Sequence, residues 1–446
     1  MNKHNSTTHS TQRPSAPNTY SMISLGCARN LVDSESMVHN MNQIGFELVP
    51  EGHNDSIRIL NTCSFIQDAI DETEDNIRQL IDQKKDGAIK HLAIVGCYPS
   101  RFKKHKLAEK FPDVDLWLTT KETPQLHIHL NELVFQKKFT PPKPVRYTKL
   151  TPAHYAYIKI SEGCNNWCTF CTIPKIRGEH TSKPLETIIE EANHHINMGA
   201  QELLLIAEDT TAWGEDIYGK PQFSMLLTEL AKLPVKWIRP MYIFPSRVDS
   251  ELIATIKREP NIANYIDMPI QHVDSGLLEG MNRRHDQAFL ESILDEMFQE
   301  IPDLSLRSTF ILGFPGETTE HVHALKDFIQ KYRFSNIGCF TYSEEYETKS
   351  ARYPNKVDPN VARIRVNDLM DTQFGLVQKY HQELVGTSLD VLYEGNGIAR
   401  SYRDAPDVDG VVTIENADAL DLSIGSFYSA RITSHKNYDL IGSIEN

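Results

Sequence analysis

Short apolar runs alternate with amphipathic stretches along the first part of the chain. Three apolar runs predict strands, and they end at the cysteines of "YSMISLGC", "IRILNTC" and "HLAIVGC". Helical spacing follows each run, in "DSESMVHNMNQIG", with a serine or aspartate cap, in "SFIQDAIDETEDNIRQLIDQKK" and in "RFKKHKLAEKFP". Strand-helix repeats of this length predict a parallel α/β sheet, which we place at residues 18–133.

The alternation stops and then resumes further along the chain. The segment "FQKKFTPPKPVRYTKLTP" is rich in proline and lysine and predicts a linker, at residues 134–149. Six strand candidates follow it: "YAYIKI", "ELLLIA", "WIRPMYIF", "YIDMPI", "LRSTFIL" and "NIGCFTYS". With helical patterns between them, they predict an incomplete (β/α)6 barrel over residues 150–382, closed by a helix near "VARIRVNDLMDTQFGLVQKYHQELVG".

The last segment, residues 383–446, has short strands and turns instead of helices. The runs "SLDVLYEG", "GIARSYRD", "DGVVTI", "SFYSARITSH" and "YDLIGSI" predict a five-stranded β-barrel. This segment holds 11 Asp and Glu against 4 Arg and Lys, a formal charge of −7, which is half of the −14 of the whole chain. We therefore expect an acidic C-terminal domain.

Composition narrows the class of protein further. A net charge of −14 argues against general binding to nucleic acids or to anionic membranes. The polar first residues are not a secretory signal, and residues 1–17 are expected to be a disordered leader. No apolar run is long enough to span a bilayer, so we expect no membrane association and a cytoplasmic location. In that compartment seven cysteines, an odd number, indicate metal binding or catalysis rather than disulfides.

Six of the seven cysteines form two sets of three. Cys27, Cys63 and Cys97 each follow a predicted strand. The carboxyl ends of neighbouring parallel strands share one edge of a sheet, so we expect these three thiols to meet there. A single cysteine is often just a small buried core residue. Three cysteines that each stand directly after a strand favour a binding site instead. Cys339 lies inside a predicted strand, and we interpret it as a core residue.

The second set has the spacing Cys-x3-Cys-x2-Cys, in "SEGCNNWCTFC". Cys164, Cys168 and Cys171 directly follow "YAYIKI" and so occupy the first loop at the top of the partial barrel. One interpretation is a zinc site completed by His180 or His154, although zinc sites usually use pairs of cysteines. The other is a 4Fe–4S cluster that leaves one iron open for a ligand. A simple electron carrier would need four cysteines for each cluster, and there are too few.

This cysteine pattern, followed by the Gly-rich strand end "TFILGFPGET", resembles the radical S-adenosylmethionine (SAM) superfamily. The resemblance implies that Cys164, Cys168 and Cys171 hold a cluster whose open iron binds SAM and cleaves it to a 5′-deoxyadenosyl radical. It also implies SAM contacts from Phe170, between two ligands, and from Gly313 and Gly316, where the backbone can approach an adenosine closely.

The three-domain layout is similar, more narrowly, to the methylthiotransferase family. The motifs are "SLGCARNLVDSE", "LNTCSFI", "IVGCY", "GCNNWCTFCTIPKIRG", "DMPIQH", "TFILGFPGET" and "SYRDAPDVDG". The resemblance implies that Cys27, Cys63 and Cys97 bind a second 4Fe–4S cluster, that its open iron holds sulfur or a methylthio group, and that the C-terminal barrel is a TRAM domain. The chain departs from the commoner family residues at Glu208, Trp213 and Glu347.

Two branches of this family differ in substrate. One modifies an adenosine in tRNA, and the RimO-type branch modifies the β-carbon of an aspartate in the twelfth protein of the small ribosomal subunit. "NTCSFIQDA", "EDTTAWGEDIYG" and "SYRDAPDVDG" resemble the RimO-type branch. Charge agrees, because an acidic domain repels RNA phosphates and complements a basic ribosomal protein. We therefore expect this substrate, no stable nucleic-acid binding, and an electron donor such as flavodoxin or ferredoxin.

Overall fold

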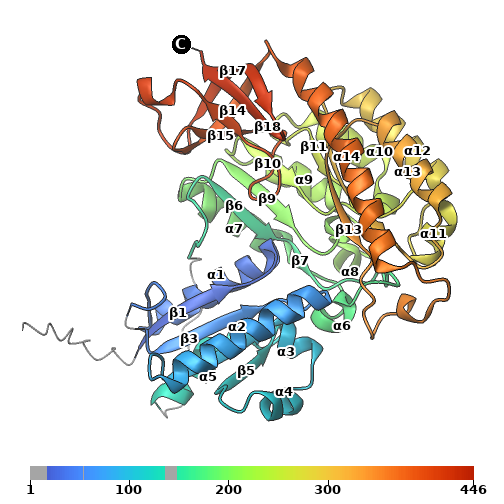
Figure 1. Cartoon of the computed structure of the whole chain (residues 1–446). Helices are drawn as coiled ribbons and strands as arrows, with labels where there is room; N and C mark the ends of the chain where they lie inside the picture. The colour runs from blue at the N-terminus through green and yellow to red at the C-terminus, as the bar shows by residue number, and fades with distance from the viewer. Residues whose placement is uncertain (1–17, 54, 136–147, 446) are drawn as a thin grey trace, which may run out of the picture. The chain divides into compact units, whose positions relative to one another are not determined.

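The computed structural model describes residues 18–53, 55–135 and 148–445 (Figure 1). It consists of two compact units, Met1–Thr148 and Lys149–Asn446, each with its own core. The predicted leader, residues 1–17, and residues 136–147 of the predicted linker lie outside the described residues. No helix in the described parts of the chain combines the length and the apolar character needed to cross a membrane.

The first unit contains one five-stranded sheet in the order β2-β1-β3-β4-β5, which is parallel, as the sequence predicts, and contains two strands, β2 and β5, beyond the three predicted ones. Its strands are β1 (Thr19–Ser24), β2 (Glu47–Leu48), β3 (Ile57–Thr62), β4 (His91–Gly96) and β5 (Leu116–Thr119). Every residue of the central strand β3 is buried, since helices cover both faces of the sheet.

Helices pack on the two faces of this sheet. They are α1 (Ala28–Gln43), α2 (Gln67–Lys85), α3 (Cys97–Arg101), α4 (Lys104–Lys110) and α5 (Leu126–Phe135), with the short 3-10 helix η1 (Thr123–Gln125) before α5. One apolar core joins α1 and α5 to the sheet, and a second joins α2 and α4 to the opposite face. The helix α2 buries Ile70, Ile77 and Leu80 at the spacing of one helical face. Helix α5 extends two residues past the predicted boundary at 133.

The predicted serine or aspartate cap of the first helix is wrong. Helix α1 begins at Ala28, five residues before the predicted stretch, and its N-cap residue is Cys27, whose side chain makes no capping hydrogen bond. The turn starts early because Gly26 takes a left-handed conformation, with φ of 89°, which brings the chain out of β1 directly into the helix.

The second unit contains the predicted six parallel strands of an incomplete barrel. They are β6 (Tyr155–Lys159), β9 (Glu202–Ile206), β10 (Trp237–Pro240), β11 (Tyr265–Asp267), β12 (Ser305–Leu312) and β13 (Phe334–Thr341). They form two three-stranded sheets, β10-β9-β6 and β11-β12-β13, which an isolated bridge between Ile238 and Ile262 links. A short antiparallel pair, β7 (Ser161–Glu162) and β8 (Thr181–Ser182), flanks the loop that follows β6.

Helices surround this partial barrel in the alternation that the sequence predicts. They are α6 (Ile173–Arg177), α7 (Leu185–Asn197), α8 (Glu215–Tyr218), α9 (Phe223–Ala231), α10 (Ser250–Arg258), α11 (Ser275–Gly280), α12 (Gln287–Glu300), α13 (Thr319–Lys331) and α14 (Pro359–Leu384), with 3-10 helices η2 (Thr210–Ala212), η3 (Pro245–Arg247) and η4 (Ser350–Arg352). Their apolar faces and the strands form one continuous core, against which the half-buried Cys339 packs as expected.

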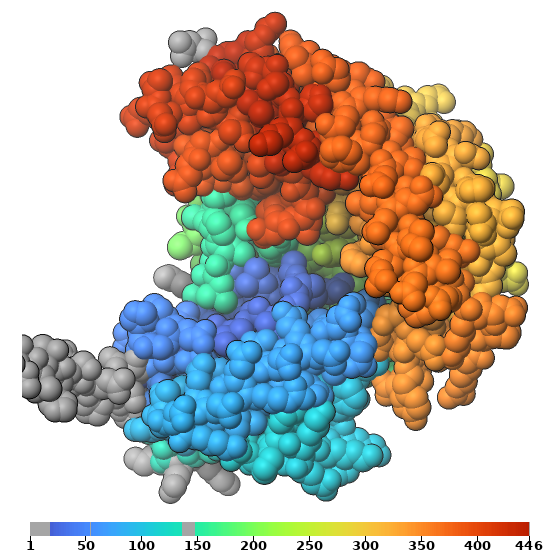
Figure 2. All heavy atoms as spheres, in the orientation of Figure 1, coloured from blue at the N-terminus to red at the C-terminus, as the bar shows by residue number. Residues whose placement is uncertain are grey.

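The C-terminal segment is a closed five-stranded barrel, also as predicted, in the order β14-β15-β16-β18-β17. Its strands are β14 (Ser388–Gly395), β15 (Ile398–Ser401), β16 (Val412–Ile414), β17 (Phe427–Lys436) and β18 (Asp439–Ile444), with η5 (Ala417–Ala419) after β16. Helix α14 ends at Leu384, two residues past the predicted boundary at 382, and packs on both β13 and β17. The orange helix and the red barrel consequently form one continuous surface (Figure 2).

Candidate iron–sulfur and SAM site

The three strands that precede Cys27, Cys63 and Cys97 are neighbours in the first sheet. Strand β3 pairs with β1 on one side and with β4 on the other, and all three run parallel, so their carboxyl ends share one edge. A Cβ placed on Gly26 would lie 2.9 Å from the Cβ of Cys63, which shows how closely the turn before Cys27 approaches that residue. The expectation that the fold gathers these cysteines at one sheet edge is therefore met.

A buried asparagine connects the three strand ends. The Nδ2 of Asn30 donates to the carbonyl oxygen of Leu25, after β1, at 2.9 Å, and to that of Thr62, at the end of β3, at 2.8 Å. The Sγ of Cys97, after β4, lies 3.6 Å from its Oδ1. Asn30 is only 1% exposed, and its own carbonyl accepts a hydrogen bond from Asn61 at 2.9 Å. This amide fixes the spacing between the backbones that carry the thiols.

The surroundings of these thiols suit a bound metal cluster. Burial, and to a lesser extent the neighbouring Cys27, raises the pKa of the Cys63 thiol, while backbone N–H groups of Phe65 and Ser64 favour its thiolate. A bound metal supplies the positive charge that a buried thiolate needs, and it displaces the thiol proton. Three thiols on one edge of the sheet fit a cluster that takes three protein ligands.

The second cysteine set lies on the loop between β7 and α6, at the top of the partial barrel. An N–H group is directed at each of its three sulfurs. The backbone N–H of Asn166 points to Cys164 at 3.5 Å and that of Ile173 to Cys171 at 3.5 Å, while the Nη1 of Arg283 points to Cys168 at 3.7 Å. Hydrogen bonds to sulfur are a usual feature of iron–sulfur ligands because they stabilise thiolate charge.

The charged side chains of Asp209 and Arg247 hold this loop in place. Asn166 donates to Asp209 at 2.7 Å, and Arg247 binds both Asn166 and Asp209, at 2.8 and 2.7 Å. Burial, with further contributions from Asp209 and Glu208, raises the pKa of the Cys164 thiol to about 12, against the opposing hydrogen bond from Asn166. As at the first site, a metal charge is what would favour the thiolate here.

The geometry disfavours the zinc interpretation. The Nε2 of His154 pairs with Glu394 at 3.0 Å, next to the C-terminal barrel, and the Nε2 of His180 contacts Ser182 at 3.1 Å. Across residues 18–53, 55–135 and 148–445, no three His, Cys, Asp or Glu side chains converge on a position for a single metal ion. These positions give no support to the zinc interpretation.

The predicted SAM contacts have different environments. Phe170 is half-buried and packs against an apolar cluster that includes Met281 and Phe314. Gly313 and Gly316 have φ of 81° and 91°. A Cβ on Gly313 would lie 2.4 Å from the Cβ of Ala362 on α14, whereas a Cβ on Gly316 would meet nothing within 4 Å. The close packing of helix α14 therefore explains why residue 313 is a glycine, whereas the space beside Gly316 is open.

Two of the departures from the family pattern have structural explanations. Trp213 is fully buried in the barrel core, and its Nε1 donates to the carbonyl of Lys183 at 2.9 Å. The side chain of Glu208 is almost fully buried and lies 3.7 Å from the Nε of Arg177. Both residues are accommodated within the fold.

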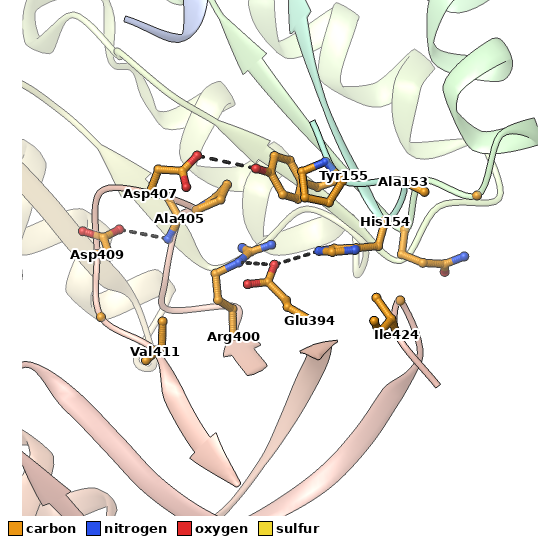
Figure 3. Close-up of a pocket in the computed structure, with 16 residues that line it drawn as sticks. Ala153, His154, Tyr155, Glu394, Arg400, Ala405, Asp407, Asp409, Val411 and Ile424 are labelled. Atoms are coloured by element: carbon orange, nitrogen blue, oxygen red, sulfur yellow. Dashed lines mark hydrogen bonds and ion pairs between the residues drawn. The ribbon is translucent and has the colours of Figure 1, made fainter. Parts of the chain in front are cut away.

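A cavity of about 810 Å³ lies at the opposite end of β6 from the cysteine loop, where the C-terminal barrel meets the partial barrel (Figure 3). In it, Glu394 pairs with His154 at 3.0 Å and with Arg400 at 2.8 Å, and Tyr155 lies 3.5 Å from Asp407. This cavity belongs to the domain junction and is distinct from the cysteine site.

The motif "SYRDAPDVDG", residues 401–410, fills this junction. The carbonyl of Tyr402 accepts from Arg239 at 2.7 Å, and Asp409 accepts from Tyr265 at 2.7 Å. Arg239 in turn binds the fully buried Glu202 at 2.6 Å. These contacts attach the C-terminal barrel to the floor of the partial barrel, so this motif has a structural role that the sequence did not reveal.

Sequence reasoning missed Asn30, Asn166 and Arg283. Asn30 stands three residues after Cys27, a spacing that places both on one side of a helix start, so a signal existed. Asn166 lies inside the cysteine motif itself. Arg283 is 115 residues from Cys168 along the chain, and no spacing could have connected them.

Comparisons with known proteins agree with this architecture. Three family models match: the uncharacterized protein family UPF0004 at residues 19–119, the radical SAM superfamily at 158–329, and the TRAM domain at 385–444. Among solved structures, the radical SAM methyltransferase TsrM from Kitasatospora setae has a TM-score of 0.55 at 12% identity, covering 91% of this chain and 81% of its own. At this identity the similarity shows the fold.

Relatives of known name cover nearly the whole chain. The ribosomal protein uS12 methylthiotransferase RimO of Citrifermentans bemidjiense is 39% identical over 95% of this chain and 98% of its own length. The enzymes of the same name from Lachnoclostridium phytofermentans and Clostridioides difficile are each 38% identical, over 95% and 94% of this chain and 99% and 97% of their own lengths. The chain belongs to the RimO family of radical SAM methylthiotransferases, enzymes that use SAM and 4Fe–4S clusters.

Proposed function

We propose that this protein adds a methylthio group to the β-carbon of an aspartate in ribosomal protein uS12, the twelfth protein of the small subunit. The observation that carries the proposal is the presence of two separate three-cysteine sites, each after the carboxyl end of parallel strands, in a chain whose relatives are named for this activity. Those relatives favour the protein substrate over the tRNA alternative.

Each cysteine set would hold one 4Fe–4S cluster. Cys164, Cys168 and Cys171 would hold the cluster that binds SAM, and Cys27, Cys63 and Cys97 would hold the second. Together the bound groups supply a 5′-deoxyadenosyl radical, able to remove hydrogen from an unactivated carbon, and the sulfur and methyl group that replace it. Acid–base side chains alone do not remove hydrogen from such a carbon.

The remaining residues of both sites would orient these ligands. Asn166 and Ile173 direct backbone N–H groups at two sulfurs of the SAM-binding set, and the Asp209–Arg247 pair fixes the loop. Gly316, beside open space, is the candidate for close approach of SAM. Phe170 and Gly313 would shape the wall of the SAM site, since both pack against apolar side chains.

The C-terminal barrel would receive the substrate protein. Seven of its eleven acidic residues are exposed, and two of its four basic residues, Arg400 and Arg403, are buried. Its remaining surface is therefore still strongly acidic, which complements a basic ribosomal protein and disfavours stable RNA binding. A small electron carrier, such as flavodoxin or ferredoxin, would reduce the clusters.

The test uses the anaerobically reconstituted full chain with SAM, sulfide, a chemical reductant and purified uS12. We expect a mass increase equal to one methylthio group in place of one hydrogen, on a peptide of uS12 that contains aspartate. Addition of that mass to tRNA instead, with uS12 unchanged, would refute the proposed substrate. The acidic surface is tested separately by exchanging exposed Asp418 and Asp421 for lysine, which should raise the KM for uS12 more than it lowers kcat.

A further inference from the structure

Arg283 is a buried cation beside a cysteine sulfur. Only 7% of the residue is exposed, and its Nη1 lies 3.7 Å from the Sγ of Cys168. Its Nη2 donates to the carbonyl oxygen of Pro269, and its guanidinium lies 4.0 Å from the centroid of the Phe244 ring. The carbonyl and the ring hold the guanidinium in a single position, so its charge cannot swing away from the sulfur.

No carboxylate neutralises this guanidinium. Among the described residues, no Asp or Glu oxygen lies within ion-pair distance of Arg283, and its buried Nε makes no hydrogen bond. The carboxylates near the loop already have other partners, because Asp209 pairs with Arg247 at 2.7 Å and Glu208 lies 3.7 Å from Arg177. An unpaired buried charge is costly, so the fold has placed Arg283 where an anion is expected.

We infer that Arg283 is the counter-ion of the cluster that Cys164, Cys168 and Cys171 hold, and that its charge raises the reduction potential of that cluster. This inference rests on the cluster assignment made above. Reduction adds one electron, and hence one negative charge, to a group in a poorly screened position. A fixed cation stabilises the more negative state, and net charge and hydrogen bonds to sulfur are among the factors that set such potentials. Arg283 is a positioning residue here, since it acts through the sulfur of Cys168.

The chain offers a matched control in the next residue. Arg284 carries the same charge but is exposed, so water screens it. The substitutions Arg283→Gln and Arg284→Gln therefore remove one positive charge each, one beside the sulfur and one in solvent. Arg283→Lys keeps the charge and loses the planar pair of donors.

The experiment measures the one-electron reduction of the cluster by EPR-monitored redox titration. It uses the full chain with Cys27, Cys63 and Cys97 changed to alanine, so that only one cluster is observed, and the titrant supplies the electron. At a fixed potential we expect Arg283→Gln to lower the ratio of reduced to oxidised cluster by about tenfold, equivalent to about 59 mV for one electron. Arg284→Gln should leave this ratio unchanged, and Arg283→Lys should fall between.

Iron analysis separates the possible failures. A parent protein without about four irons would overturn the cluster assignment, and this inference with it. A parent and an Arg283→Gln variant that both hold iron at the same midpoint potential would overturn the inference alone. If Arg283→Gln loses its iron, then retention of iron by Arg283→Lys supports the counter-ion role, and loss from both variants refutes it.

Discussion

The side-chain oxygen of Asn30 lies 3.6 Å from the sulfur of Cys97, although the two residues are 67 positions apart in the chain. The same amide donates to the carbonyls that end β1 and β3, next to the other two cysteines of the set. One residue thus contacts all three strand ends of the first site. Its position makes the geometry of that site dependent on a side chain that is not itself a ligand.

The first prediction concerns that residue. Asn30→Ala should lower the iron bound at the first site, because the strand ends lose their shared partner, and should destabilise the first unit by about 1–3 kcal/mol through unsatisfied buried carbonyls. Iron is measured in the full chain with Cys164, Cys168 and Cys171 changed to alanine. Asn40→Ala, on the same helix but bonded only weakly to Pro124 at 3.4 Å, is the control. Equal iron in both variants would contradict the prediction.

Substitutions in the two cysteine sets should separate SAM cleavage from methylthio transfer. The parent protein, purified without oxygen, should contain about eight irons, the number for two four-iron clusters. Cys164→Ala should abolish 5′-deoxyadenosine production from SAM, whereas Cys63→Ala should leave this production measurable and stop methylthio transfer. Chromatography quantifies the nucleoside and mass spectrometry the product. Deoxyadenosine from Cys164→Ala, or normal product from Cys63→Ala, would show that the sites are wrongly assigned.

Gly313 and Gly316 form a matched pair for a stability test. Both have left-handed backbone angles, 81° and 91°, so alanine costs about 1–2 kcal/mol at either position. Only at Gly313 would the new Cβ also collide with Ala362, at 2.4 Å. We expect Gly313→Ala to destabilise the second unit by about 1–3 kcal/mol more than Gly316→Ala, and Ala362→Gly to recover part of that difference. Urea denaturation of the variants measures it, and equal losses would exclude the collision.

Asp404 should make the stability of the second unit dependent on pH. Burial raises the pKa of this carboxyl to about 6, from 3.8, despite a hydrogen bond from Ser401. Because the folded state holds the proton more tightly, this contribution is fully present below about pH 4 and is lost as the pH rises to about 6. The loss amounts to at most about 3 kcal/mol.

The check compares Asp404→Asn with the parent by urea denaturation at several pH values between 4 and 7. The variant cannot ionise at this position, so its free energy of unfolding should fall less with rising pH than that of the parent. Asp418→Asn, which changes an exposed carboxyl in the same domain, should follow the parent. Identical pH profiles for Asp404→Asn and the parent would mean that Asp404 ionises normally in the folded protein.

The sequence by itself determined the domain architecture, the two sets of cysteines and the family. Apolar periodicity located the parallel strands and the C-terminal barrel because the spacing of buried residues is a local property of each element. Parallel pairing then brought Cys27, Cys63 and Cys97 to one edge. It required only that the three predicted strands be neighbours in the sheet, as β1, β3 and β4 are.

Only the tertiary structure decided which side chains support those cysteines. Arg283 contacts Cys168 although 115 residues separate them in the chain. The close packing of Ala362 explains why a glycine stands at position 313. The segment 401–410, which resembles the RimO-type branch, also attaches the C-terminal barrel to the partial barrel through Tyr402 and Asp409. Such contacts depend on how elements pack in space, and a single sequence carries no record of which distant side chains a packed fold will bring together.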